Sequence, residues 1–453
     1  MMQHRHAVTD FVWKDGRLVD PADLVRELDL LAGPDPVERA RGLWGQFALH
    51  QAAGDAHVLV RDPLGVNKLF FAIGARGEVV SSSYWIDLVR AGHPASAIWS
   101  VPSGRVLRVE PARRRLELTP YATLRFNPDP RPEPGAEDAA RIRRALDAAF
   151  ERIRAAACGR PLYVTVSGGL DSTTIAALAR RHLGEFTAVT FAIHDGGDGP
   201  SRPTEDLQYA SRVAAELRVP LRVVHATADE LLSLIDVALC YGQDWRDFNV
   251  HCALVNAAIG RAIAEDVARD APPPAARPVL LTGDTMNELV ADYAPVSYRG
   301  RDYYPLPRMP AGQLRRFLVQ GLDAGDREVG VFTHYGLDAI QPYALCVEAY
   351  AALPGGCLER PEAKQALVRQ VMGDAIPSYI YERPKVRAQV GGAGEVRGTL
   401  AALVDRGIDS AALERRFCEL FDLDPSRLRR AIRAGLYQFP TAYPDPMPSV
   451  HAS

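Results

Sequence analysis

An apolar segment at 161–166, PLYVTV, runs directly into the glycine pair Gly168–Gly169, and a helical pattern follows over 171–183. A buried strand, a tight glycine turn and a helix in this order form the first half of a β-α-β unit. Because such units pack their helices on the faces of the sheet, this segment favours a parallel, doubly wound α/β sheet. Further strands of that sheet are predicted at 186–193, 221–226 and 278–284, and the chain beyond about Tyr303 is predicted to be mainly helical.

The first ~125 residues follow a different pattern, in which short alternating segments are separated by Gly, Asp and Pro. Such alternation predicts half-buried strands of a mainly antiparallel sheet. Residues 126–136 contain four prolines and no aliphatic run, which is typical of an extended linker. The 453 residues are therefore expected to form an α+β domain at 1–125, a linker at 126–136 and an α/β domain at 137–453, which begins with a helix over 137–157.

Composition excludes several classes of partner. With 53 Lys and Arg against 56 Asp and Glu, the net charge of -3 argues against a nucleic-acid binder that works through a broad basic surface. No apolar stretch reaches eighteen residues, so no membrane span is expected. The N-terminus lacks the apolar core of a signal peptide, which predicts a cytoplasmic protein. Six scattered cysteines without CxxC spacing predict neither disulfides nor structural zinc.

The glycine turn also has the composition of a phosphate site. Its glycines allow the backbone to approach an anion closely, and the helix that follows directs unpaired N–H groups toward that anion. Its hydroxyls add donors, and Asp171 is suited to hold Mg²⁺ against phosphates. The alternative is an ordinary β-to-α turn with a Ser or Asp helix cap. The predicted anion-binding residues are Val166, Ser167, Gly168, Gly169, Asp171, Ser172 and Thr173.

The string SGGLDS at 167–172 resembles the PP-loop of the ATP pyrophosphatases, which cleave ATP to AMP and pyrophosphate. Within that superfamily, the asparagine-synthetase-like enzymes are favoured by four further segments in conserved order, at 61–72, 205–217, 280–293 and 326–354. The resemblance covers nearly the whole chain. It implies ATP and Mg²⁺ as cofactors, an Ntn-hydrolase-like antiparallel sandwich in the first domain, and a nucleotide site that also includes Ile193, Thr282 and Gly283.

Asparagine synthetases use an N-terminal cysteine as the glutaminase nucleophile, and this sequence lacks one. Met1 is followed by Met2, and the first cysteine is Cys158. Since such a nucleophile needs a free amine beside a thiol or hydroxyl, the first domain is expected to be a retained scaffold without glutaminase activity. The same loss is a feature of the β-lactam synthetases and carbapenam synthetase, which adenylate a carboxylate and close a ring with an amine.

The segment at 376–395 resembles the RPK motif and glycine-rich loop of the β-lactam synthetases. The resemblance implies that Lys385 stabilises the acyl-transfer transition state and the pyrophosphate leaving group. Only four of the 53 basic residues are lysines, so a lysine at 385 is more informative than an average surface cation, although a solvated loop lysine is the alternative. The glycines at 391, 392 and 394 suggest a mobile flap over the acyl-adenylate.

Other positions depart from the family pattern. Asp284 stands where asparagine synthetases have a catalytic Glu and β-lactam synthetases a catalytic Tyr, and it is a candidate to orient or deprotonate the amine. Asn287 stands where both have a metal-binding Asp, so Glu288 or Asp284 is expected to compensate, unless the second metal site is reduced. Asp326 and Glu328 are the nearest equivalents of the Glu that β-lactam synthetases pair with their Tyr, and an N-cap is the alternative for Asp326.

Together these features predict a ligase that adenylates a small-molecule carboxylate with ATP and transfers the acyl group to an amine, in specialised metabolite biosynthesis. Carboxylate and amine could belong to one molecule, to two molecules or to a peptide, and a homodimer is one candidate assembly. A lasso-peptide macrolactam cyclase, an ammonia-dependent asparagine synthetase-like enzyme and a non-catalytic nucleotide-binding scaffold remain as alternatives.

Overall fold

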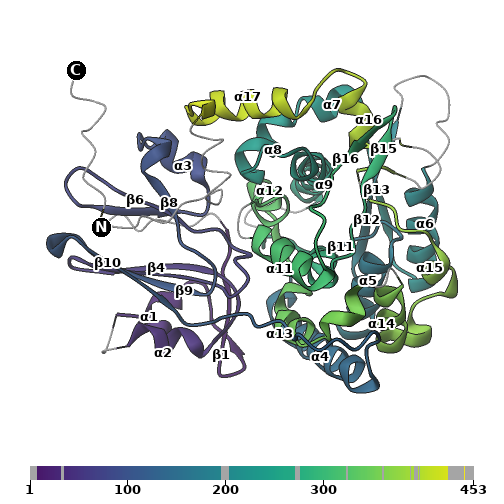
Figure 1. Cartoon of the computed structure of the whole chain (residues 1–453), viewed down its shortest axis with the longest axis horizontal. Helices are drawn as coiled ribbons and strands as arrows, with labels where there is room; N and C mark the ends of the chain where they lie inside the picture. The colour runs from purple at the N-terminus through teal and green to yellow at the C-terminus, as the bar shows by residue number, and fades with distance from the viewer. Residues whose placement is uncertain are drawn as a thin grey trace.

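The computed structural model describes residues 8–31, 35–194, 204–270, 276–322, 325–359, 362–387, 389–391, 396, 398–426 and 443 (Figure 1). An N-terminal part built mainly of strands lies beside a larger part that combines helices with a parallel sheet.

All strand pairs of the N-terminal part are antiparallel, as the alternating sequence predicts. They form three small sheets with the orders β2-β1-β3, β10-β9-β5-β4 and β7-β6-β8. The strands are β1 (Phe11–Lys14), β2 (Arg17–Leu18), β3 (Leu43–Gln46), β4 (Ala48–Ala53), β5 (Ala56–Arg61), β6 (Phe70–Ile73), β7 (Val79–Ser82), β8 (Ile98–Ser100), β9 (Arg105–Glu110) and β10 (Arg115–Pro120). Three short helices accompany them, α1 (Leu24–Leu28), α2 (Pro36–Arg41) and α3 (Trp85–Arg90).

The sheets β10-β9-β5-β4 and β7-β6-β8 share one apolar cluster, in which Leu59 and Leu107 meet Leu69 and Phe71. Alternating side chains of each strand thus enter a common core. The finer expectation of an Ntn-hydrolase-like sandwich stays a prediction, as do the domain boundaries.

Buried polar contacts join the N-terminal part to the rest of the chain. The Tyr84 hydroxyl donates to the Gly330 carbonyl at 2.7 Å, and the Gln46 side-chain amide donates to the Ala339 carbonyl at 2.7 Å. Gln243 receives a hydrogen bond from the Trp85 backbone at 2.8 Å. Because unpaired buried polar groups are costly, these matched contacts fix how the two parts sit against each other.

The larger part contains a five-stranded, all-parallel sheet with the order β13-β12-β11-β14-β17, which confirms the expected mixed α/β fold with a parallel sheet. Strand order reverses between β11 and β14, and ligands of open α/β sheets bind at such a point, outside the carboxyl ends of the strands. The strands are β11 (Leu162–Thr165), β12 (Thr187–His194), β13 (Leu221–Thr227), β14 (Val279–Leu281) and β17 (Asp338–Ile340).

Helices cover both faces of this sheet, with α5 and α6 on one side and α9 on the other (Figure 1). The helices that precede β14 are α4 (Ala136–Ala157), α5 (Leu170–His182), α6 (Glu205–Leu217), α7 (Ala228–Leu232), α8 (Ile235–Gly242) and α9 (Asp247–Asp270). Those that follow it are α10 (Met286–Val290), α11 (Ala311–Gly321), α12 (Val329–His334), α13 (Val347–Ala351), α14 (Ala363–Met372), α15 (Ser378–Glu382), α16 (Thr399–Val404) and α17 (Ser410–Phe421).

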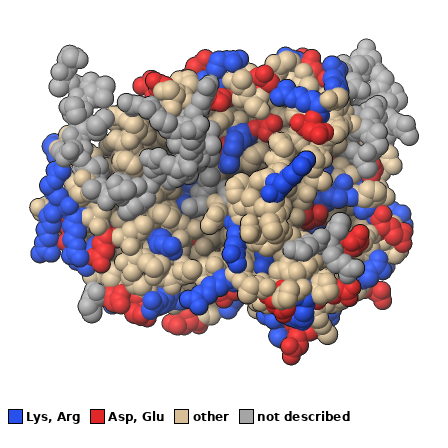
Figure 2. Space-filling view, viewed as in Figure 1, with Lys and Arg blue, Asp and Glu red and all other residues tan. Residues whose placement is uncertain are grey.

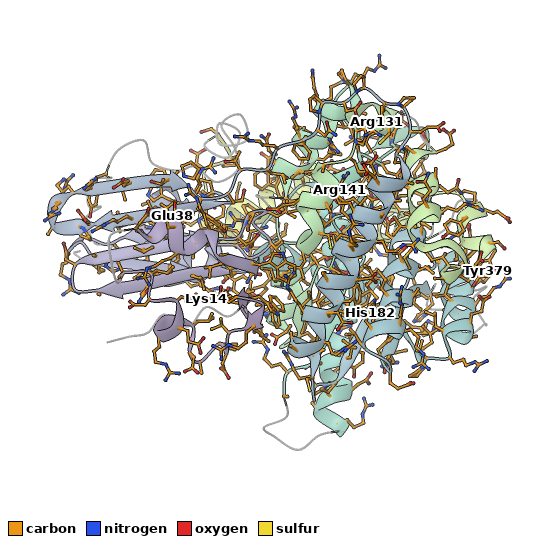
Figure 3. The ribbon with its side chains drawn as sticks, turned by 90° about the horizontal axis from the view of Figure 1, so that it is seen from below. Lys14, Glu38, Arg131, Arg141, His182 and Tyr379 are labelled. Carbon is orange, nitrogen blue, oxygen red and sulfur yellow. The ribbon has the colours of Figure 1, made fainter. Side chains whose placement is uncertain are left out.

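The proline-rich segment is tied to α4 by charge pairs. Arg131 lies 3.5 Å and Arg141 2.6 Å from the carboxylate of Asp138, which is buried in the first turn of α4. His182, at the end of α5, lies 2.9 Å from Asp147 of α4. Figure 3 shows the labelled Arg131, Arg141 and His182 along α4. The chain at 121–135 contains neither helix nor strand, in keeping with a linker.

The expectation of a mainly helical stretch beyond Tyr303 is confirmed, with one strand that was not predicted. The stretch beyond Tyr303 is mainly helical, but it also contains β17, the edge strand of the parallel sheet, and a hairpin of β15 (Val296–Tyr298) with β16 (Arg301–Tyr303) precedes it. A three-residue strand embedded among helices leaves no periodic signal long enough to recognise.

The face drawn in Figure 2 carries basic and acidic side chains on both halves of the molecule. Among the described residues, no helix combines the length and apolar character needed to cross a membrane.

Candidate active site

A cavity of about 440 Å³ opens where β11 and β14 end, at the reversal of strand order. Its walls come from the loops after these strands, from α9 and from the segment that follows α15. Convergence of loops at this edge follows directly from parallel strand topology.

The glycine loop begins one wall of the cavity. Gly168 has φ +70°, and a Cβ placed there would lie 2.3 Å from Cβ of Tyr209 on α6. Gly169 caps α5, and the first residues of α5 line the cavity. A Cβ on Gly283 would lie 2.9 Å from the Ser172 backbone, so the two loops are in close contact. The loop therefore provides the open backbone and helix N-terminus that favour anion binding.

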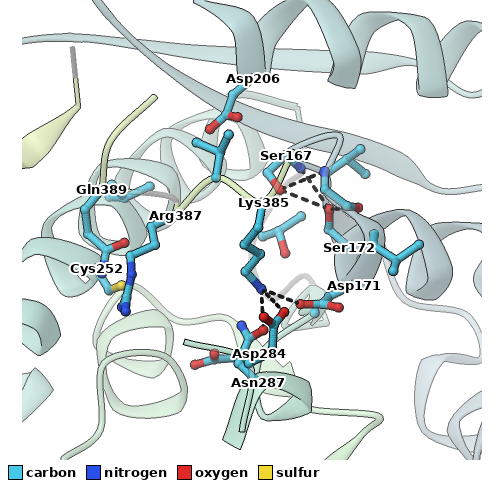
Figure 4. Close-up of a pocket in the computed structure, with 18 of the residues that line it drawn as sticks. Ser167, Asp171, Ser172, Asp206, Cys252, Asp284, Asn287, Lys385, Arg387 and Gln389 are labelled. Carbon is cyan, nitrogen blue, oxygen red and sulfur yellow. Dashed lines mark hydrogen bonds and ion pairs between the residues drawn. The ribbon is translucent and has the colours of Figure 1, made fainter. Parts of the chain in front are cut away.

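Two lysines meet three oxygen-bearing side chains in the cavity, and Figure 4 labels Lys385, Asp171 and Asn287 of this group. Nζ of Lys364 lies 2.7 Å from Asp171 Oδ2, 2.7 Å from Asn287 Oδ1 and 3.0 Å from Asp292 Oδ2. Lys385 contacts the same three groups: it donates to Asn287 and lies 3.0 Å from Asp292 Oδ2 and 3.6 Å from Asp171 Oδ2. The sequence separates these residues by up to about two hundred positions, and the fold gathers them at one point.

The charges in this cluster support each other. Burial alone would raise the pKa of Asp292, but the charges of Lys364 and Lys385 outweigh it and lower this pKa to about 2. Burial, together with the charge of Lys364, lowers the pKa of Lys385. The Lys385 side chain is 40% exposed and that of Lys364 only 7% exposed. Lys385 is thus the more exposed of the two cations, and Lys364 is the buried one.

A second charge cluster surrounds Arg327, between Asp326 and α12. Its guanidinium donates to both carboxylate oxygens of Asp284, at 2.8 and 2.7 Å, and to Glu288 Oε1 at 3.0 Å. Glu328 Oε2 accepts hydrogen bonds from Thr282 at 2.5 Å and from Gln341 at 2.9 Å. Burial, reinforced by the negative charge of Asp284, raises the pKa of Glu328 well above its ordinary value.

The loop that holds Asp284 is strained. Thr285 has φ +82°, a conformation that β-branched residues rarely adopt, and its fully buried hydroxyl donates to Gln341 at 3.1 Å. Such strain persists only where the surroundings impose it, and it gathers at functional sites. Here it turns Asp284 toward Arg327 while Asn287, three residues later, faces the lysines.

Arg383 fixes the segment that carries Lys385. Its guanidinium donates to the Ser167 carbonyl at 3.0 Å, pairs with Asp206 and lies over the ring of Tyr209 at 4.3 Å. Because this side chain is only 3% exposed, the segment is tied to both the glycine loop and α6. Arg387, four residues on, also lines the cavity and donates to the Ala294 carbonyl at 2.8 Å.

Residues 141–327 match the family model described as asparagine synthase. A protein of Mycobacterium tuberculosis (strain H37Rv), provisionally named asparagine synthetase (glutamine-hydrolyzing), is 29% identical over 320 residues, which cover 64% of this chain and 46% of that protein. The carboxyethyl-arginine β-lactam synthase of Streptomyces clavuligerus is 25% identical over 403 residues, covering 84% of this chain and 71% of that enzyme. The chain is thus similar both to asparagine synthetases and to a β-lactam synthase.

The expected family is thereby confirmed, although the matched region spans less than half the length of the mycobacterial relatives. Among solved structures, the NMN synthetase of Francisella tularensis aligns over 67% of this chain and 98% of its own at 10% identity. Its TM-score of 0.32 is too low to bear on the fold.

Most family-motif residues named from the sequence line the cavity. These are Val166, Ser167, Gly169, Asp171, Ser172, Gly283, Asp284, Asn287, Glu328 and Lys385. Four others support it without lining it: Gly168 and Thr173 belong to the glycine loop and α5, Thr282 holds Glu328, and Glu288 is held by Arg327. Ile193 lies on β12, outside the lining. Gly392 and Gly394 of the expected flap lie outside the described residues.

Asp326 is a correction. Its Oδ1 accepts the Gly330 backbone N–H at 2.8 Å, and it is buried against the start of α12 instead of lining the cavity. Glu328 holds the N-cap position of α12, and Asp326, two residues earlier, satisfies one backbone N–H of the first turn of this helix. The position of Asp326 outside the cavity lining favours this structural role over the catalytic role that the sequence suggested.

Sequence reasoning missed several residues of the site. Lys364, Asp292, Arg327, Arg383 and Arg387 all line the cavity. The scarcity of lysine that drew attention to Lys385 applied equally to Lys364, and it could have identified that residue too. Asp292 and Arg327 gave no signal, since their importance depends on partners far away in the sequence.

Magnesium is compatible with the residues around Asp171. Oδ1 of Asp171 is buried and has no hydrogen-bond partner, while Oδ2 already faces a cation. Carboxylate and amide oxygens suit this ion. No group of three or more His, Cys, Asp or Glu side chains that could hold a metal occurs in the described part of the chain. A metal here would therefore need the amide of Asn287 or oxygens of the nucleotide as additional ligands.

Proposed function

We propose that this protein is an ATP-dependent carbon–nitrogen ligase. A carboxylate oxygen attacks the α-phosphorus of ATP, the bond to the pyrophosphate breaks, and an acyl-adenylate forms. An amine then attacks the acyl carbon and loses a proton, which yields an amide and AMP. The observation that carries the proposal is the meeting of an anion-binding glycine loop with Lys364, Lys385 and Asp171 in one cavity.

The two lysines suit the charge that develops when pyrophosphate leaves. Compact ammonium groups held close to phosphate oxygens stabilise such charge most strongly where water is limited. Lys364 is a buried cation between two carboxylates, and Lys385 is the more exposed cation that can follow the leaving group. Bound magnesium would neutralise phosphate charge, and Asp171 would hold it there.

Proton removal from the amine is better assigned to Glu328 than to Asp284. Both oxygens of Asp284 are occupied by the Arg327 guanidinium, which makes it a poor proton acceptor. Glu328 lines the cavity and has a raised pKa, which makes its carboxylate a stronger base than an exposed glutamate. Asp284 then acts by positioning Arg327.

The rest of the cavity indicates a substrate with an apolar portion beside an anionic group. Phe248, Cys252, Val255 and Ile259 line it from one face of α9. Burial raises the pKa of Cys252 to about 12, so its neutral thiol contributes apolar surface and not a nucleophile. Arg387 is paired with no carboxylate of the described residues, which leaves its charge available to a substrate anion.

Trapping of the acyl-adenylate tests the ligase. The protein is incubated with ATP, Mg²⁺, hydroxylamine and a panel of amino and dicarboxylic acids, and hydroxamate and pyrophosphate are measured together. Equal amounts of hydroxamate and pyrophosphate are expected with at least one acid. A nucleotide that binds with no pyrophosphate released from any acid would favour the scaffold alternative. Mass spectrometry of the natural product then separates a lactam or macrolactam from an intermolecular amide.

Glutamine is not expected to serve as the nitrogen donor. Residues 1–157 contain no cysteine, so the N-terminal sheets have no thiol nucleophile with which to attack the glutamine amide. The amount of glutamate formed from glutamine, with and without ATP, measures this. Ammonium chloride is the control donor, and glutamate release above the rate without protein would contradict the expectation.

Glutamate 328 should govern the pH dependence of amide formation. Only its ionised form accepts a proton, so the rate should rise with pH, with a midpoint above that of an exposed glutamate, about 4.3. Glu328→Gln should slow amide formation by about 10²–10⁴-fold and remove this rise. Hydroxamate trapping should change little, because neutral hydroxylamine attacks without a base. Exposed Glu348→Gln is the matched control. An unchanged pH profile in Glu328→Gln would exclude it as the base.

A further inference from the structure

Asn287 leaves the expected metal site one carboxylate short. By the family resemblance this position carries a metal-binding Asp, and the neutral amide is a weaker ligand. The sequence suggested Glu288 or Asp284 as the substitute. In the structure both carboxylates are turned toward Arg327, at 3.0 and 2.7 Å, and Glu288 also accepts from the Tyr293 hydroxyl. Asp171 instead contacts Lys364 and Lys385.

Asp292 contacts the same two lysines as Asp171. Its Oδ2 lies 3.0 Å from Nζ of both Lys364 and Lys385, the same ammonium groups that contact Asp171. Oxygens of Asp171, Asn287 and Asp292 thus surround Lys364 Nζ within 3.0 Å. They come from the start of α5, from α10 and from the residues just after α10. This is an oxygen-lined position that already holds a positive charge.

We propose that Asp292 is the second magnesium carboxylate of this protein and replaces the one missing at 287. The assignment rests on the proposed function, because the ion would bridge the protein and the phosphates of ATP. In this arrangement Asp171 and Asp292 supply the two carboxylates and Asn287 a neutral oxygen, while Lys364 and Lys385 move to the phosphates.

The balance of charge around the two lysines supports a carboxylate at position 292 in place of one at position 287. Two carboxylates balance two ammonium groups at this point, so an Asp at 292 restores the charge that Asn287 removes. The bond between the Asp292 backbone N–H and the Asn287 carbonyl, 3.0 Å, places the two side chains in one turn of chain. A carboxylate can therefore shift from 287 to 292 without moving the ion across the cavity.

The test measures the affinity of the protein for Mn²⁺ in the presence of a non-hydrolysable ATP analogue. Electron paramagnetic resonance reports the concentration of free Mn²⁺. Asp292→Asn should weaken Mn²⁺ binding by about 10–100-fold, as loss of a metal-site partner typically does. Asn287→Asp combined with Asp292→Asn returns the carboxylate to 287 and should restore affinity to within about threefold of the starting protein. Asp229→Asn, at a side chain 84% exposed on α7, is the matched control and should change nothing.

Unchanged Mn²⁺ affinity in Asp292→Asn, or no recovery in the double variant while it remains folded by thermal unfolding, would show that Asp292 serves only the lysines. Calorimetry of the analogue in EDTA separates this from the proposed function. An analogue that binds the starting protein leaves the ligase standing even if the Asp292 assignment fails, whereas an analogue that does not bind overturns both.

Discussion

Replacing Lys385 by alanine is expected to lower product formation by about 10²–10³-fold while changing nucleotide affinity by less than about threefold. Lys364 would remain in the cavity, so one of the two cations available to the phosphates is retained. What is lost is the more exposed cation, which can follow charge as the pyrophosphate leaves. An effect on rate without an effect on binding is the mark of an interaction made in the transition state.

The measurement is pyrophosphate release at saturating ATP, with nucleotide affinity determined separately by calorimetry. Lys14→Ala is the matched control, because Lys14 lies in the N-terminal part and donates to a backbone carbonyl there. Lys385→Arg adds a further distinction: a planar guanidinium keeps the charge but not the compact shape, so only partial activity should return. Normal turnover in Lys385→Ala would remove this residue from the mechanism.

The glycine loop was predictable from sequence because its signal is local. Strand, turn and helix follow one another within about twenty residues, and each step has a physical requirement that the sequence meets. The strand order of the sheet then places the loop at the cavity, next to the segment that follows β14. The same holds for α4, which was predicted over 137–157 and spans Ala136–Ala157 in the structure.

The electrostatics of the site were not predictable in the same way. Asp284 looked like a base in sequence, yet the fold pairs it with Arg327, forty-three positions away. Lys364 lies on α14 in a segment with an ordinary helical pattern, and only the fold brings it to Asp171. Asp292 lies inside the family-like segment at 280–293, yet the resemblance assigns it no role. Charge pairs across long separations change the role of a residue without changing its local pattern, so they need the structure.

Gly168→Ala is expected to abolish measurable nucleotide binding and to destabilise the protein by about 2–5 kcal/mol, combining a left-handed backbone with an overpacked contact. An alanine there must adopt φ +70°, and its Cβ would lie 2.3 Å from Cβ of Tyr209 and 2.8 Å from the Tyr209 carbonyl carbon. Either the loop or α6 has to move. Since α6 holds Arg383 through Asp206, and Arg383 holds the segment that carries Lys385, the displacement would reach both walls of the cavity.

Gly159→Ala separates the cost of the left-handed backbone from the cost of the close contact. Gly159 has nearly the same φ, +69°, but no atom lies within 4 Å of the added Cβ. This control should cost only about 1–2 kcal/mol, the backbone contribution, and leave nucleotide affinity unchanged. Thermal unfolding midpoints and calorimetry with an ATP analogue measure both effects. If Gly168→Ala and Gly159→Ala behave alike, the close approach to Tyr209 does not matter and the glycine serves the turn alone. If only Gly168→Ala loses the nucleotide, the glycine is required because the loop packs against α6 beside the anion site.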